Sequence, residues 1–186
     1  MVTQTETTQI ITQPKLDDTV QPSVKRWLKH FCYISATHRY FNQQQRLEIA
    51  QVVQQAEKGH VGEIQVVIEG HIPLSQVYKQ NTRLRAQQLF AELGVWDTEL
   101  NSGVLLYLNL CERKVEIVVD RGLKHATTAH TWQDICQHMV GLLMQKHYVP
   151  AVMRGVVEIG KVLDQYYLHA EKHERNELPN EPIVLD

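Results

Sequence analysis

The stretch VWDTELNSGVLLYLNLCERKVEIVVDRGL, residues 95–123, decides the fold. It contains two apolar runs, residues 104–110 and 115–119, which are joined by a short polar turn at residues 111–114. Two strands with so short a connection must run antiparallel, so the stretch predicts a β-hairpin. The start of its first strand and the end of its second strand then lie at one edge of the sheet.

Polar loops flank the predicted hairpin, residues 96–103 before it and residues 120–122 after it. Antiparallel pairing brings the two loops to the same edge of the sheet. The side chains that we therefore expect to lie near one another are Asp97, Glu99, Asn101, Asp120 and Arg121.

The rest of the chain predicts helices around this sheet. Residues 62–70 form a nearly continuous apolar strand, and residues 77–93 carry a helical apolar stripe that ends before Gly94. A strand–helix–strand crossover makes the first strand parallel to the hairpin's first strand. His60 and Glu63 would then lie at the same edge as the two polar loops. We predict an α/β fold with a small mixed sheet, a parallel crossover plus an antiparallel hairpin, and helices on both faces.

Composition predicts one domain with polar ends. Residues 1–21 lack periodicity and predict a disordered leader, residues 22–168 a single domain, and residues 169–186 a polar tail. The formal charge of -2 gives no global attraction to nucleic acid. The sequence has three cysteines without a CxxC pair, no secretory signal and no apolar run of about 20 residues. These features favour a cytoplasmic protein without an integral membrane segment.

Residues 22–41 are predicted to form an amphipathic helix and a linker. The apolar side chains recur at helical spacing and the basic ones occupy the other side. We expect the apolar face to pack on the domain and the basic face to be solvated, with docking on a membrane surface as the alternative. The apolar set is Val24, Trp27, Leu28, Phe31 and Ile34, and the basic set is Lys25, Arg26 and Lys29.

Oxygen-bearing side chains at the predicted edge suggest a site for Ca²⁺ or Mg²⁺, which prefer carboxylates, amide carbonyls and water. The spacing of Asp97, Glu99 and Asn101 alternates as in a calcium loop, but it lacks the glycine and the closing glutamate of an EF-hand. Asp120 and Glu63 complete the candidate set. In the alternative interpretation these residues cap turns or are solvated, and Asp120 pairs with Arg121.

The same edge offers a hydrolytic alternative. Arg121 could hold a phosphate oxygen, Asp120 could bind a metal that activates water, and His60 could act as a base. The sequence contains no HExxH, P-loop, GxGxxG or GxSxG motif. A zinc site, a nucleotide and an organic cofactor are therefore not predicted.

Several short motifs follow one another in an order typical of a known family. They are FAELGVW at 90–96, SGVLL at 102–106, RKVEI at 113–117, DRGL at 120–123, and Trp132 before two closing helices. From about residue 57 to 163 the chain resembles a TPM domain, a family that includes a thylakoid-lumen protein linked to photosystem II repair. It is most similar to short bacterial members with an Asp-Arg-Gly corner.

The resemblance implies an α/β/α sandwich, divalent cations in the loops and an acid phosphatase activity. Two positions depart from the family pattern. Asn101 stands where the family usually has an acidic residue, and Asp120-Arg121-Gly122 replaces the common Gly-Tyr-Gly corner. We expect a binding or regulatory module whose loop edge binds a divalent cation or a protein partner. A weak metal-dependent phosphatase and a membrane-peripheral adaptor are the alternatives.

Overall fold

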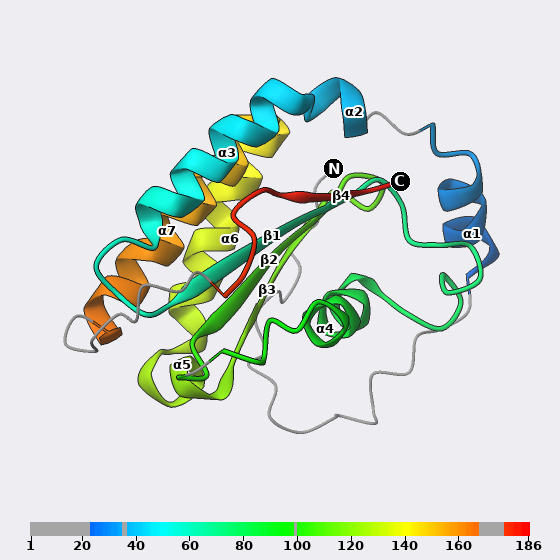
Figure 1. The fold of residues 1–186 in the computed structure, drawn as a ribbon. Coiled ribbons are helices and arrows are strands. Elements are labelled where there is room, and N and C mark those ends of the chain that lie inside the picture. Colours follow the sequence, from blue (N-terminus) through cyan, green and yellow to red (C-terminus); the bar gives the residue numbers. More distant parts are fainter. Residues whose placement is uncertain (1–22, 35–36, 99, 168–176) are drawn as a thin grey trace.

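The computed structural model describes residues 23–34, 37–98, 100–167 and 177–186 (Figure 1). The predicted leader and Glu99 lie outside these residues. The elements in chain order are α1 (Val24–Phe31), α2 (Thr37–Tyr40), α3 (Gln43–Ala56), β1 (Glu63–Glu69), α4 (Thr82–Glu92), β2 (Gly103–Asn109), β3 (Lys114–Val119), α5 (Arg121–Ala126), α6 (Ala129–Met144), α7 (Tyr148–Tyr167) and β4 (Ile183–Leu185).

The strands form a mixed sheet in the order β3-β2-β1-β4. β2 and β3 are antiparallel and pair Val104 with Val119, as expected for a hairpin. β1 and β2 are parallel and pair Glu63 with Gly103. The α/β fold, the hairpin and the crossover through α4 are thus confirmed. The beginnings of β1 and β2 and the end of β3 lie at one edge.

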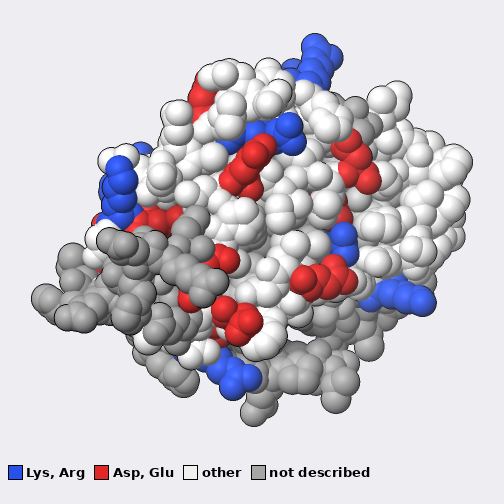
Figure 2. Space-filling view, viewed as in Figure 1, with Lys and Arg blue, Asp and Glu red and all other residues white. Residues whose placement is uncertain are grey.

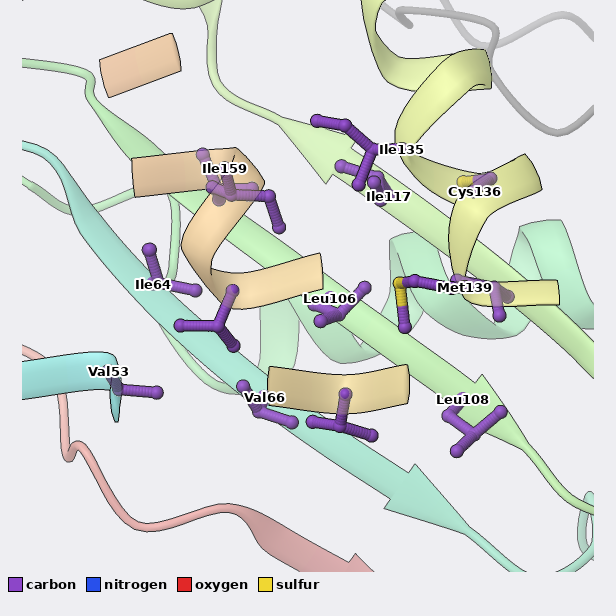
Figure 3. Close-up of a cluster of buried hydrophobic side chains, with 14 of the residues drawn as sticks. Val53, Ile64, Val66, Leu106, Leu108, Ile117, Ile135, Cys136, Met139 and Ile159 are labelled. Carbon is purple, nitrogen blue, oxygen red and sulfur yellow. The ribbon is translucent and has the colours of Figure 1, made fainter. Parts of the chain in front are cut away.

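Helices cover both faces of the sheet (Figure 1). α3, α6 and α7 pack on one face, where alternate strand residues and the helices form a large apolar cluster. Figure 3 shows Ile64 and Val66 of β1 and Leu106 of β2 in this cluster, with Met139 of α6 beside Leu106 and Ile135 of α6 beside Ile117 of β3. α4 covers the other face through a smaller cluster. Leu105, Leu106, Val115 and Ile117 are all buried, as the hairpin prediction requires.

The C-terminal residues contradict the prediction of a polar tail. Ile183–Leu185 form β4, which pairs in parallel with residues 67–69 of β1. The backbone N–H of Gly70 also donates a hydrogen bond to the Leu185 carbonyl at 2.7 Å. A run of three apolar residues carries no usable period, and it becomes a strand because the backbone of β1 offers an open edge. The domain therefore extends past residue 168.

Two helix limits differ from the prediction for local reasons. α4 begins at Thr82 rather than at residue 77, because the Asn81 side chain caps it by accepting a hydrogen bond from the Leu84 N–H. The predicted loop after β3 contains α5, whose N-cap is Asp120. Six residues are too few to show helical periodicity in the sequence.

The orientation of α1 is the opposite of the one predicted. Arg26 and His30 face the domain and bind Glu112 in the hairpin turn. The apolar side chains Leu28 and Phe31 are exposed, and Ile34, just after the helix, is 89% exposed. An amphipathic pattern locates the two faces of a helix but does not say which one meets the domain.

Candidate functional site

The two polar loops meet at the predicted edge of the sheet. The Gly122 N–H donates to the Asn101 carbonyl at 3.1 Å, and the Asp120 N–H donates to the Gly103 carbonyl at 3.0 Å. Asn101 has a positive φ of 51°, a conformation that asparagine tolerates better than most residues. Thr98 holds the first loop, since its hydroxyl accepts from the Ser102 N–H at 2.9 Å. The connectivity argument thus places Asn101 beside the end of β3.

Asp120 is the charged group at the centre of this edge. Its side chain is buried, and its Oδ1 accepts a hydrogen bond from the Arg121 N–H at 2.6 Å. Its Oδ2 is also buried and has no hydrogen-bond partner among the described residues. Burial raises the pKa of this carboxyl group, and the Arg121 amide and guanidinium only partly oppose the effect. One carboxylate oxygen therefore lacks the compensation that a buried charge needs.

Neutral oxygen atoms surround the adjoining Gly122. A methyl group at this glycine would lie 2.6 Å from the Asn101 carbonyl oxygen, 2.7 Å from the Tyr167 hydroxyl and 3.0 Å from the Leu100 carbonyl oxygen. Burial, and then the charge of Asp120, raise the pKa of Tyr167, so its hydroxyl keeps its proton. The surroundings of Gly122 thus combine the buried carboxylate of Asp120 with two backbone carbonyls and a phenol, all hard oxygen donors.

The other predicted side chains near this edge differ in their burial. Asp97 and Arg121 are exposed, whereas Glu63 is buried at the start of β1. Within the described part of the chain, no group of three or more His, Cys, Asp and Glu side chains is placed to hold a metal ion. A cation beside Asp120 would depend on its carboxylate together with backbone and hydroxyl oxygens and water.

His60 lies at the same edge but is engaged by the backbone. It is fully buried, its Nε2 is 2.7 Å from the Ala56 carbonyl, and its Nδ1 accepts from the Gly62 N–H at 3.0 Å. Nε2 must therefore carry the proton. The carboxylate of Asp164 lies 4.0 Å from Nε2. These contacts favour a structural role in the turn between α3 and β1.

The sequence profile of the TPM domain matches residues 34–162. The chain belongs to the TPM domain family. No curated protein matches the sequence. Among the described helices, none combines the length and the apolar character needed to cross a bilayer.

Two solved structures share the fold of this TPM domain. The NMR structure of the BA42 protein from the psychrophilic bacterium Bizionia argentinensis is 23% identical, with a TM-score of 0.66, and the match covers 76% of this chain and 92% of that one. The N-terminal domain of a protein from P. gingivalis is 22% identical, with a TM-score of 0.59 and coverage of 72% and 82%.

The structure adds three oxygen donors that sequence reasoning missed. The carbonyl groups of Leu100 and Asn101 carry no side-chain signature, so no motif could have revealed them. Tyr167 is at the end of α7, 45 residues or more from the hairpin in the sequence, and only the packing of α7 brings its hydroxyl to Gly122.

Proposed function

We propose that this TPM domain is a divalent-cation-binding module whose site lies where the loop before β2 meets the start of α5. The observation that carries the proposal is the buried Oδ2 of Asp120, which accepts no hydrogen bond from the described residues. A cation would supply the missing positive charge. The carbonyl and hydroxyl oxygens beside Gly122 are the neutral ligands that Ca²⁺ or Mg²⁺ would use.

The donor set predicts weak binding. Calcium affinity rises with the number of charged ligands, and among the described residues of the Asn101 loop and the start of α5 the buried carboxylate is that of Asp120. Asn101 contributes a neutral side chain where an acid would strengthen the site. A cation at this point would join the loop of Asn101 to α5, and so would stiffen the corner at which β3 ends.

Thermal unfolding tests the proposal directly. Ligand at ten times its dissociation constant stabilises the folded state by about 1.4 kcal/mol, which corresponds to a rise in Tm of about 3–6 °C for a domain of this size. We expect such a rise with millimolar CaCl₂ or MgCl₂ against an EDTA baseline, and none with NaCl at equal ionic strength.

Two variants test the site, and a third variant serves as the control. Asp120→Asn should abolish the rise in Tm, and Asn101→Asp should make it larger at the same cation concentration. Asp134→Asn removes an exposed carboxylate of α6 that pairs with His130, and it should leave the rise intact. If wild type and Asn101→Asp both melt unchanged up to tens of millimolar cation, the module does not bind divalent cations.

A further inference from the structure

α1 is held against the domain by its polar side. The guanidinium of Arg26 binds Glu112 and donates to the backbone carbonyls of Val77 and Gln80. The imidazole of His30 is buried, with its Nε2 2.8 Å from Glu112 Oε1 and its Nδ1 accepting from the Ile72 N–H at 3.1 Å. These five hydrogen bonds, which reach four residues of the domain, fix the rotation of this eight-residue helix.

Glu112 is the acceptor on which this attachment depends. Burial alone would raise its pKa, but the hydrogen bonds from His30 and Arg26 and the charges of Arg26 and Lys29 lower the pKa to about 2. The carboxylate is thus ionised throughout the neutral range. α1 is therefore anchored to the hairpin turn by a partly buried ionic contact rather than by apolar packing.

The anchored helix presents its apolar side outward. Val24, Leu28 and Phe31 are 65%, 48% and 59% exposed, and they recur at the i, i+4 and i+7 positions of one helix face. Trp27 stacks on Phe31 with ring centroids 5.1 Å apart and on the exposed Tyr78 at 6.5 Å. We call this set, Val24, Trp27, Leu28, Phe31 and Tyr78, the outer apolar face.

Two lysines border the outer apolar face. Lys25 and Lys29 are exposed, and at 100° per residue they share one flank of the helix, next to Leu28. Figure 2 shows the surface over α1 as a broad white area with blue lysine or arginine atoms at its lower border. Aromatic and aliphatic groups beside lysines match the interior and the anionic headgroups of a lipid surface.

We propose that the outer apolar face of α1 docks on an anionic membrane surface, with Leu28 and Phe31 inserted between the headgroups and with Lys25 and Lys29 on the phosphates. The face consists of five side chains, whereas a stable protein interface buries about 800 Å² and about 20–30 residues of each partner. Binding to a lipid surface does not require a partner of complementary shape. Eight residues with two lysines predict reversible, salt-sensitive binding.

Vesicle flotation with the full chain tests this docking. We expect partitioning onto vesicles that contain 30% phosphatidylserine, little onto pure phosphatidylcholine, and a loss of several-fold when NaCl is raised, because the lysine contacts are screened. Trp27 should move into a less polar environment, so Trp fluorescence should shift to the blue on binding. The shift should disappear in Trp27→Phe and persist in Trp96→Phe.

Matched substitutions separate the two contributions. Leu28→Ser/Phe31→Ser and Lys25→Gln/Lys29→Gln should each weaken partitioning about tenfold or more. The exposed Met144 and Lys161 lie on α6 and α7, so Met144→Ser and Lys161→Gln should leave it unchanged. All these side chains are solvent-facing, and circular dichroism melting should show that each variant stays folded.

Three results would overturn the proposal. The first is no flotation on anionic vesicles by the folded wild type. The second is flotation that Leu28→Ser/Phe31→Ser does not reduce. The third is a concentration-dependent dimer in sedimentation equilibrium that dissociates in Leu28→Ser/Phe31→Ser, together with no vesicle binding, since this would make a second copy the occupant of the face. None of these results bears on the cation site, which lies at Asp120.

Discussion

The two faces of the sheet are both buried, but they are stabilised by different interactions. Toward α3, α6 and α7, alternate residues of the central strands are all apolar, and they join the large cluster. Toward α4, the intervening residues include several polar groups that are as fully buried. These are Gln65 and Glu69 of β1, Tyr107 and Asn109 of β2, and Glu116 of β3.

A hydrogen-bonded network makes the α4 face possible. Arg85 of α4 places its Nε and Nη2 at 2.9 and 2.7 Å from Glu69 Oε1, while the Tyr107 hydroxyl donates to Glu69 Oε2 at 2.5 Å. Asn109 donates to the same hydroxyl at 2.9 Å. Burial and the charge of Glu69 raise the pKa of Tyr107 well above its usual value, so the phenol stays protonated. Both carboxylate oxygens are therefore satisfied.

This difference explains how α4 alone can cover one face of the sheet, whereas α3, α6 and α7 together cover the other. An apolar cluster tolerates small shifts between its members, whereas an Arg–carboxylate pair fixes distance and direction. The second polar pair, Thr82 with Glu116 at 2.7 Å, fixes the start of α4 in the same way. We infer that α4 is positioned by these polar contacts, and that the opposite face supplies most of the apolar burial.

The largest effect is expected from a charge placed in the large cluster. Ile117→Asp should unfold the domain at 25 °C, because a buried carboxylate without a partner costs several kcal/mol, a large part of a total stability of about 5–15 kcal/mol. Ile117→Val, which keeps the site apolar, should cost about 1 kcal/mol. Urea denaturation followed by circular dichroism measures both. A folded Ile117→Asp with a normal transition would contradict the assignment of Ile117 to the core.

The second largest effect should come from breaking the network on the α4 face. Arg85→Met leaves Glu69 charged and buried, and should cost about 3–5 kcal/mol. Adding Glu69→Gln removes that charge and should restore part of the loss. Arg154 of α7 also pairs with a glutamate, Glu158, but its side chain is 55% exposed, so Arg154→Met should cost less than about 1 kcal/mol. Equal losses for Arg85→Met and Arg154→Met would show that the network does not stabilise α4.

Acid should distinguish two carboxylates of the hairpin, the partly buried Glu112 and the fully buried Glu116. The pKa of Glu112 is about 2, below its ordinary 4.5, so its stabilisation is present above pH 4.5 and is lost as pH falls toward 2. Between pH 7 and pH 3 the loss should be about 2 kcal/mol, and it should be absent in Glu112→Gln. Burial raises the pKa of Glu116, so its contribution has the opposite sign, is greatest at low pH, and is lost as pH rises through its folded pKa. Glu116→Gln should therefore lose more stability on acidification than wild type does.

Much of the fold followed from the sequence because its strongest signals are local. The hairpin at residues 103–119 and the crossover through α4 rest on apolar runs and short connections, and both are present. The burial of the polar residues on the α4 face was harder to predict from the sequence. Glu69 and Glu116 have the usual character of solvated strand residues, and their burial depends on contacts with Arg85 and Thr82 of another element.

The candidate site was predictable only in part. Connectivity brought Asn101 and Asp120 to one edge, but it could not show that Asp97 is exposed or that Tyr167 reaches Gly122 from α7. The face of α1 that meets the domain depends on Glu112, more than 80 residues away in the sequence. Long-range ion pairs and backbone carbonyls leave no periodic pattern, so these features require the folded structure.

The smallest expected effect concerns β4, where the two faces meet at an edge. The Val184 side chain packs against the large cluster, and Ile183 and Leu185 pack against the smaller one. All three are only partly buried, so a chain ending at Pro182 should lose about 1–2 kcal/mol of stability. The Gly70 N–H would lose its acceptor in Leu185, and its hydrogen exchange should accelerate. Removing Asp186 alone breaks an exposed pair with His38, and should cost less than about 0.5 kcal/mol. If the chain ending at Pro182 matched wild type in both stability and exchange at Gly70, β4 would contribute to neither face, and residues 183–186 would be the dispensable tail that their composition suggests.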